Sequence, residues 1–225
     1  MKRLRIKHVT GFRYAGEVTA SYNEARMLPV TGERQLVLHS NLEVLPVSSH
    51  HQYTDYWGTR VLAFDVLAPH RELALTATSL VEVLGSAESH PTLAWPDLST
   101  AIARSGDYVQ QLRQTVLTEP PESVVELARE IAADVQDPCA VALEICRSVG
   151  QSMEYMRGVT GVHSTAAEAW ADKKGVCQDI THVALGALRA AGIPARYVSG
   201  YLHPLPDAPV GETVTGESHA WVEWF

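Results

Sequence analysis

The apolar residues of this chain change their period part-way along it, and that change limits the folds that are open to it. Residues 1 to about 85 hold short runs rich in β-branched and aromatic residues, separated by turn residues. Such spacing is typical of a β-sandwich. From Glu122 onward the apolar residues recur with a helical period. The sequence therefore predicts an α+β protein, in which an all-β sandwich domain precedes a part made of helices and strands.

Three regions follow from this change of period. Residues 1–90 are expected to form the sandwich, 91–120 a linker with a helix at about 107–117, and 121–225 the mixed part. Small and polar residues open the linker, and two prolines end it. The strands predicted for the sandwich span 4–14, 35–44, 61–66 and 73–84.

Local signals predict where the helices of the C-terminal part begin and end. Asp137 before Pro138 is typical of an N-cap followed by proline at the first helical position. Residues 165–168 form a capping box, and 173–175 are expected to close that helix with favourable charge and a C-terminal glycine. Another helix should run from Cys177 to Gly192. Strands are expected at 195–202 and 217–225.

Composition excludes several classes of function. The chain has 225 residues, with 18 Lys and Arg against 26 Asp and Glu, a net charge of −8. This sign argues against a nucleic-acid partner, which needs a positive surface. No run approaches the ~18 apolar residues of a membrane span. Three cysteines, at 139, 146 and 177, do not form a disulfide framework, so a reducing cytoplasm is expected. No spacing of metal ligands or cofactor motif occurs, so neither a metal nor a cofactor is expected.

Cys177 and His219 are the residues best suited to chemistry. Cys177 opens a helical pattern, and the free N–H groups and dipole of a helix start favour a thiolate. His219 lies on a predicted strand beside large aromatic residues. A thiolate and an imidazolium together form the nucleophile and base of acyl transfer. The alternatives are a small core cysteine and a structural histidine, since free cysteines are often core residues and the chain has ten histidines.

Three motifs, in order, resemble the transglutaminase-like core, a papain-like cysteine fold. They are Gly175–Asp179, Leu188–Tyr201 and Ser218–Glu223. The N-terminal part is similar to the β-rich domain that precedes this core in a bacterial subgroup, through Tyr56–Gly58 and Pro69–Leu73. Together these resemblances cover most of the chain.

The resemblance implies a role for each matching residue. Cys177 would attack a carboxamide carbonyl of a protein or peptide, and His219 would act first as general base and then as acid. The thioester would pass to water or to an amine. The backbone N–H of Cys177 would be the first oxyanion donor. Weaker candidates for the oxyanion site or the cleft are Tyr155, Trp170, Gln178 and Tyr201. For Tyr155 and Trp170 the sequence favours the alternative, an aromatic core residue.

One member of the family's pattern is missing. The family supplies an orienting Asp one strand beyond the His, whereas this chain has no Asp after Asp207 and ends at Phe225. Asp179 matches the Cys-x-Asp motif, which is not the third triad member. We therefore expect a core truncated at its C-terminus, weakly active or inactive. Its exposed sheet edge at 217–225 could support a dimer. Two alternatives remain open: a non-catalytic module that binds peptides or cell wall, and a structural partner of another enzyme.

Overall fold

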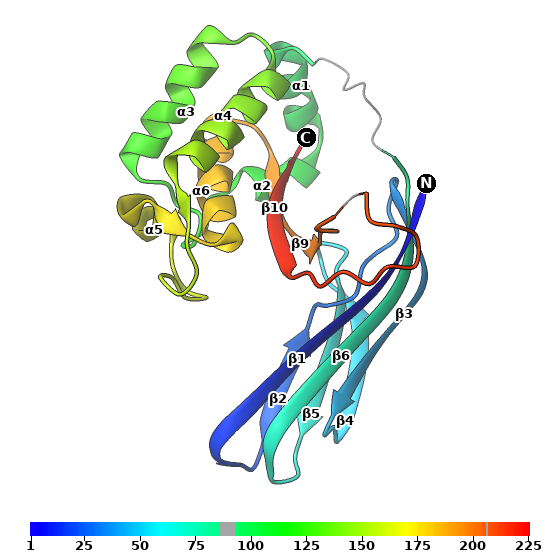
Figure 1. Ribbon diagram of the computed structural model, residues 1–225. Coiled ribbons are helices and arrows are strands. Elements are labelled where there is room, and N and C mark those ends of the chain that lie inside the picture. Colours follow the sequence, from blue (N-terminus) through cyan, green and yellow to red (C-terminus); the bar gives the residue numbers. More distant parts are fainter. Residues whose placement is uncertain (86–92, 206) are drawn as a thin grey trace. The chain divides into compact units, whose positions relative to one another are not determined.

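The computed structural model describes residues 1–85, 93–205 and 207–225, apart from the side chain of residue 134. The chain divides into two compact units, Met1–Ser89 and His90–Phe225 (Figure 1). The second unit takes in the described part of the segment interpreted from sequence as a linker. The opening of that linker, at 86–92, lies outside the described residues. None of the helices in the described part of the chain is long and apolar enough to span a bilayer.

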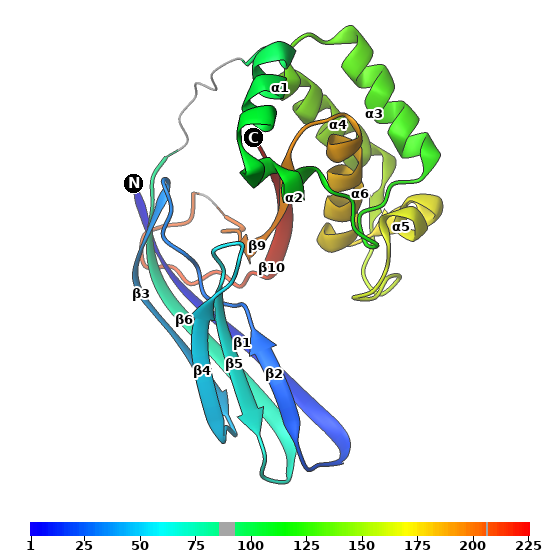
Figure 2. The same cartoon turned by 180° about the vertical axis from the view of Figure 1, so that it is seen from behind.

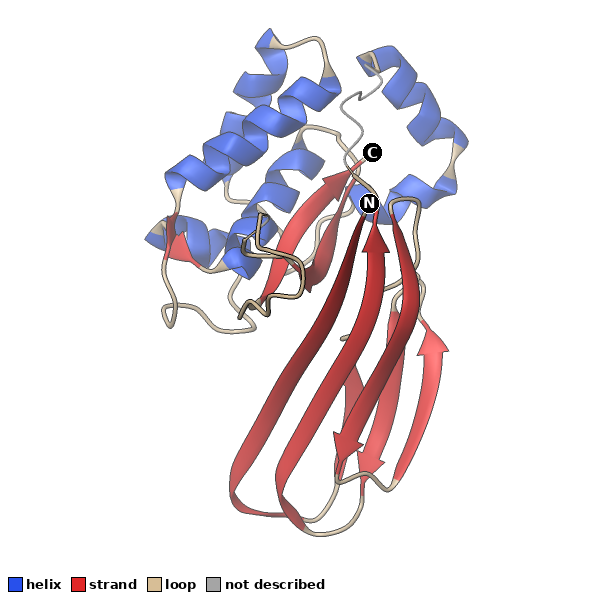
Figure 3. Cartoon of the chain, turned by 45° about the vertical axis from the view of Figure 1, so that its right-hand side comes forward, coloured by secondary structure: helices blue, strands red, loops and turns tan. Residues whose placement is uncertain are grey.

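In the described residues of unit 1, the secondary-structure elements are all antiparallel strands (Figure 3). They are β1 (Lys2–Val18), β2 (Ser21–Ala25), β3 (Gln35–Leu45), β4 (Ser49–Thr54), β5 (Arg60–Val66) and β6 (His70–Val83). The described strands form two sheets, ordered β1-β6-β3 and β2-β5-β4. Leu42 and Leu75 from the first sheet share one core with Leu62 and Phe64 from the second. This is the predicted β-sandwich, and the four predicted strands are confirmed.

Two strands of unit 1, β2 and β4, were not expected from the sequence. Each residue of β4 is exposed, so no alternation of buried and exposed positions marks this strand. It exists because its backbone pairs with β5, as β2 does on the other side of the same strand. Backbone pairing of this kind leaves little trace in composition.

Unit 2 surrounds one central helix. Its elements are α1 (Trp95–Arg104), the 3₁₀ helix η1 (Gly106–Tyr108), α2 (Val109–Leu112), α3 (Glu122–Asp134), α4 (Pro138–Ser152), β7 (Glu154–Tyr155), α5 (Ala166–Asp172), β8 (Lys174–Gly175), α6 (Cys177–Ala190), β9 (Ala195–Tyr201) and β10 (Ser218–Trp224). Helices α3, α4 and α5 pack against α6, as do β9 and β10 (Figure 2). Residues Thr181–Leu188 of α6 are therefore buried without interruption.

Most of the predicted helix ends are confirmed. The Asp137 side chain accepts from the Cys139 N–H at 3.0 Å. Thr165 and Glu168 form the expected reciprocal capping box, at 3.2 and 2.8 Å. Two predictions were wrong. The left-handed residue after α5 is Lys173, with φ 53°, and not Gly175. The helix expected at 107–117 ends at Leu112, because a turn held by side-chain hydrogen bonds follows at 115–118.

The order α6–β9–β10 along the chain determines which ends of these three elements lie together. Helix α6 has 14 residues and so spans about 21 Å. After a turn at Gly192, β9 returns alongside it over seven residues, about 23 Å. Strand β10 pairs antiparallel with β9, with Ser218 opposite Tyr201. The first residues of α6 and of β10 therefore lie at the same end of unit 2 (Figures 1 and 2).

Candidate active site

Cys177 is the first residue of α6, as the sequence predicts. Its thiol is free and half-buried. The N–H groups of the first turn of an α-helix have no partner within the helix and, together with the helix dipole, favour negative charge. Val176 precedes it in extended conformation and accepts from the N–H groups of Asp179 and Ile180. The thiol thus sits where an anion is stabilised.

Asp179 holds the start of α6 in place. Its Oδ2 accepts from the Val176 N–H at 2.7 Å and from the Thr160 hydroxyl at 2.6 Å. Valine has no acceptor in its side chain, so only this half of a capping box exists here. The carboxyl group is buried, at 1% exposure, and its Oδ1 has no hydrogen-bond partner among the described residues. The Cys-x-Asp motif therefore fixes the backbone on both sides of the nucleophile candidate.

His219 is the second residue of β10 and is half-buried. It lies opposite Gly200 in β9, and the Trp221 ring packs over that glycine. Strand alternation places His219 and Trp221 on one face. Val222, on the other face, packs against the core that contains α6. Within the described residues, no hydrogen bond joins the Cys177 thiol to His219, and no carboxylate is bonded to His219. The structure brings the two residues to one end of the unit.

Tyr197 in β9 and His182 in α6 pack together, and the sequence analysis named neither as a site residue. Tyr197 pairs with Val222 and so faces α6. Its ring centroid is 5.6 Å from that of His182. Burial, and then electrostatic interactions with Cys177 and Asp179, raise the pKa of Tyr197. The sequence held one signal for Tyr197: it shares a face of strand β9 with the site candidate Tyr201, because the two residues are four apart.

His182 is a buried imidazole on the nucleophile helix. Burial lowers its pKa, although the Asp179 charge and a hydrogen bond to the backbone of Ser164 act the other way. Its Nδ1 is buried and has no hydrogen-bond partner in the part of the chain that the structure describes, so Nε2 carries the contact with Ser164. The ring therefore ties α6 to the segment before α5.

The remaining predicted site residues fall into two groups. Tyr155, Gln178 and Tyr201 border the start of α6: Tyr155 pairs with Gly175, Gln178 follows the thiol, and Tyr201 ends β9. Trp170 does not belong with them. It is buried in the core, and its indole N–H donates to the Ser123 hydroxyl at 3.0 Å. That bond leaves Trp170 with no N–H for an oxyanion.

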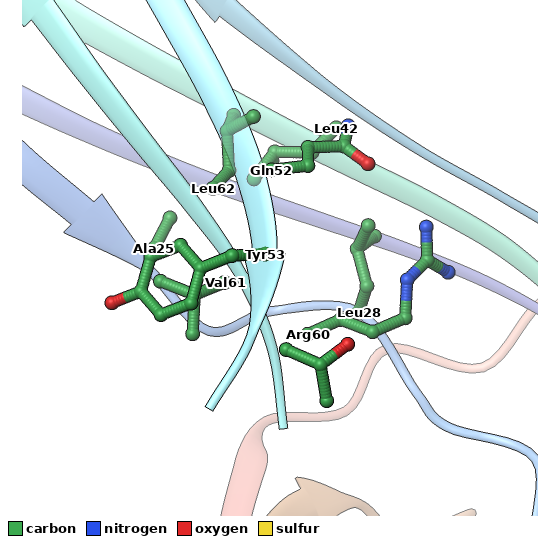
Figure 4. A pocket seen from close by; sticks show the side chains of 9 residues that line it. Ala25, Leu28, Leu42, Gln52, Tyr53, Arg60, Val61 and Leu62 are labelled. Atoms are coloured by element: carbon green, nitrogen blue, oxygen red, sulfur yellow. The ribbon is translucent and has the colours of Figure 1, made fainter. Parts of the chain in front are cut away.

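Two of the hollows in the described part of unit 1 are lined by neither Cys177 nor His219. Figure 4 shows the smaller one, of about 150 Å³, between Leu28, Tyr53 and Arg60. The larger one, of about 300 Å³, has Phe12, Phe64 and Leu73 among its apolar residues. In the described part of the chain, no three His, Cys, Asp or Glu side chains gather as a metal site would require.

A strand-rich unit followed by helices around a central helix and an antiparallel sheet defines an α+β protein with a cysteine at the start of its central helix. Family models give this arrangement a name. Residues 4–82 match the bacterial transglutaminase-like N-terminal region. Residues 125–225 match the transglutaminase-like superfamily. The chain belongs to the bacterial transglutaminase-like family, as the sequence motifs indicate.

Two relatives and one solved structure are similar to this chain over nearly its whole length. Uncharacterized protein ML0607 from Mycobacterium leprae is 42% identical over 99% of this chain and 79% of its own length. Uncharacterized protein Rv2569c from Mycobacterium tuberculosis is 31% identical over 97% of this chain and 72% of its own length. A crystal structure of a candidate cysteine protease from Cytophaga hutchinsonii superposes with a TM-score of 0.76, covering 99% of this chain and 72% of that one at 19% identity. That last similarity supports the fold.

Proposed function

We propose that this protein is a cysteine-dependent acyl-transfer enzyme that acts on amide bonds of a protein or peptide. One observation carries the proposal: Cys177, the first residue of α6, and His219, the second residue of β10, lie at the same end of unit 2. A thiol at a helix start and an imidazole on a neighbouring strand are the parts of a nucleophile and its base. Membership of the transglutaminase-like family supports the same reading.

The proposed reaction uses His219 first as a base, then as an acid and then again as a base. His219 takes the Cys177 proton, and the thiolate attacks the carbonyl carbon. The Cys177 backbone N–H donates to the resulting oxyanion. His219 then gives its proton to the leaving nitrogen, so that ammonia or an amine departs and a thioester remains. Water or a second amine attacks the thioester, His219 accepts the proton of that nucleophile, and the thiolate is released.

The reactivity of Cys177 tests this proposal. Iodoacetamide labelling of Cys177, followed against pH by peptide mass spectrometry, should show a midpoint below the ~8.5 of an ordinary thiol. His219→Asn should move that midpoint upward. Cys177→Ser should abolish release of ammonia or amine from carboxamide peptides. An ordinary midpoint that ignores His219→Asn would remove the enzyme proposal. We also propose a cytoplasmic location, and the three free cysteines support it.

The larger hollow in unit 1 favours a second candidate, a module that binds peptides or cell-wall fragments. Its apolar residues are joined by polar ones, including His8, Asn23 and Arg26. Concave surfaces of this mixed kind are typical of ligand sites. Calorimetric titration of Cys177→Ser with short peptides and with muropeptides should give saturable binding, and Phe12→Ser should weaken it. Flat titrations with both ligands would exclude this candidate.

A further inference from the structure

The segment 156–164, between β7 and α5, contacts the elements of both catalytic candidates. Thr160 donates to the Oδ2 of Asp179, two residues after Cys177, at 2.6 Å. Arg157 donates to the Oε2 of Glu217, two residues before His219, at 2.6 Å. One short segment thus reaches the sequence neighbours of both groups.

The contacts on the α6 side are buried. Asp179 is 1% exposed and His182 is 7% exposed, and His182 bonds to the backbone of Ser164 at the end of the segment. A turn between Gly161 and Ser164, closed by bonds of 2.9 and 3.1 Å, stiffens the segment between these two contacts. Because buried hydrogen bonds to a charged group are costly to break, this side is the fixed one.

The contact on the β10 side is exposed. The side chains of Arg157 and Glu217 are 69% and 57% exposed. An exposed ion pair adds little to stability. The ion pair affects position instead of stability, because it holds the start of β10 next to a segment that is already fixed to α6.

We propose that the segment 156–164 is a strap that aligns Cys177 with His219, with Thr160 and Arg157 as its positioning residues. The inference rests on the proposed function. Neither residue touches the reacting atoms, so both act through the elements that they hold. Small displacements matter here, because a misplacement of about 1 Å can cost about 100-fold in rate.

Charge exchange at the exposed pair tests the strap. Arg157→Glu and Glu217→Arg should each lower the rate of thioester formation severalfold, and the double variant should recover at least half of the wild-type rate. The matched control is Arg147→Glu, which breaks the exposed pair with Glu144 on α4 and should leave the rate unchanged. Single variants that react at the wild-type rate, or a double variant as slow as the product of the two single losses, would overturn the inference.

Thr160 supplies a second arm. Thr160→Val should slow thioester formation about tenfold, the equivalent of about 1.4 kcal/mol, and should raise the midpoint of Cys177 labelling. Thr160→Ser, which keeps the hydroxyl, should behave as wild type. Tyr197 of β9 interacts with the thiol, and Asp179 and His182 are the other ionisable groups near the start of α6. They are the same in both variants, so the difference reports the hydroxyl. A Thr160→Val protein with wild-type rate and midpoint contradicts the strap.

The two proposals fail in different ways. If wild-type Cys177 labels as an ordinary thiol and ignores His219→Asn, the proposed function and the strap are both lost. If wild-type Cys177 is activated but the Arg157, Glu217 and Thr160 variants match it, the strap alone is lost.

Discussion

Gly175 and Asp179 approach so closely that a Cβ on Gly175 would lie 2.6 Å from the Cβ of Asp179 and 2.7 Å from its Oδ2. Both neighbours belong to a buried side chain that is held by Val176 and Thr160. The Gly-x-Cys-x-Asp motif therefore requires glycine at its first position, because a larger residue would collide with the Asp179 side chain. The φ of Gly175 is not positive, so backbone freedom is not the reason.

Gly175→Ala should destabilise the protein by about 1–3 kcal/mol, the usual range for overpacking a tight site. Urea unfolding measures the loss. Gly150→Ala is the matched control: Gly150 lies inside α4, where an added Cβ meets nothing within 4 Å. That change should stabilise the protein by about 0.5–1 kcal/mol through helix propensity. Equal effects at the two glycines would contradict the steric account.

Arg189 joins three segments of unit 2. Its guanidinium donates to the Gln111 carbonyl, the Thr118 hydroxyl and the Ala195 carbonyl, each at 3.0 Å. Arg189→Met should cost about 3 kcal/mol of stability, because it leaves acceptors of the buried residues Thr118 and Ala195 unpaired. Arg147→Met, which removes only an exposed ion pair, should cost less than about 0.5 kcal/mol. Thermal unfolding of both variants makes the comparison, and similar losses would count against this role.

Cys146 should resist alkylation in the folded protein. Burial raises the pKa of its thiol to about 11, so the reactive thiolate is scarce near neutral pH. At pH 8, brief iodoacetamide treatment followed by peptide mapping should label Cys177 and spare Cys146. After denaturation in urea both should be labelled. Labelling of Cys146 at the rate of Cys177 in the folded state would refute this prediction.

His182 should make stability depend on pH. Burial lowers its pKa in the folded protein, whereas the unfolded chain binds its proton near pH 6.5. The unfolded state therefore holds more protons below that pH, and the free energy of unfolding falls as pH drops from 7.5 to 5. His182→Gln should flatten this fall in urea titrations. His8, whose pKa burial also lowers, is common to both proteins and cancels. An unchanged slope would contradict the prediction.

Local chemistry explains which parts of the fold the sequence predicted. The caps at Asp137 and Thr165 depend on residues within one turn, so their pattern is sufficient evidence. The same holds for Gly192, whose φ of 80° ends the chain's run along α6. Strand β4 depends instead on pairing with β5, from Thr54 with Arg60 to Ser49 with Asp65, and its exposed residues carry no periodic signal.

The candidate site divides in the same way. Cys177 and His219 were found through motifs, and the structure places both at the expected ends of their elements. Trp170 was a candidate because of its residue type, but its partner Ser123 lies 47 residues away and could not be foreseen. Thr160, Arg157 and Glu217 sit in loops whose residue types suggest nothing, and only folding brings them to α6 and β10.

The exposure of the Arg157–Glu217 pair has a consequence for how the protein would respond to its surroundings. Dissolved ions compete with such a contact, and at physiological ionic strength charges interact over only about 8 Å. Salt would weaken the Arg157–Glu217 ion pair next to β10 and leave the buried hydrogen bonds of Asp179 intact. Turnover would then decline in concentrated electrolyte well before the protein melts, although neither the sulfur nor the imidazole belongs to that ion pair.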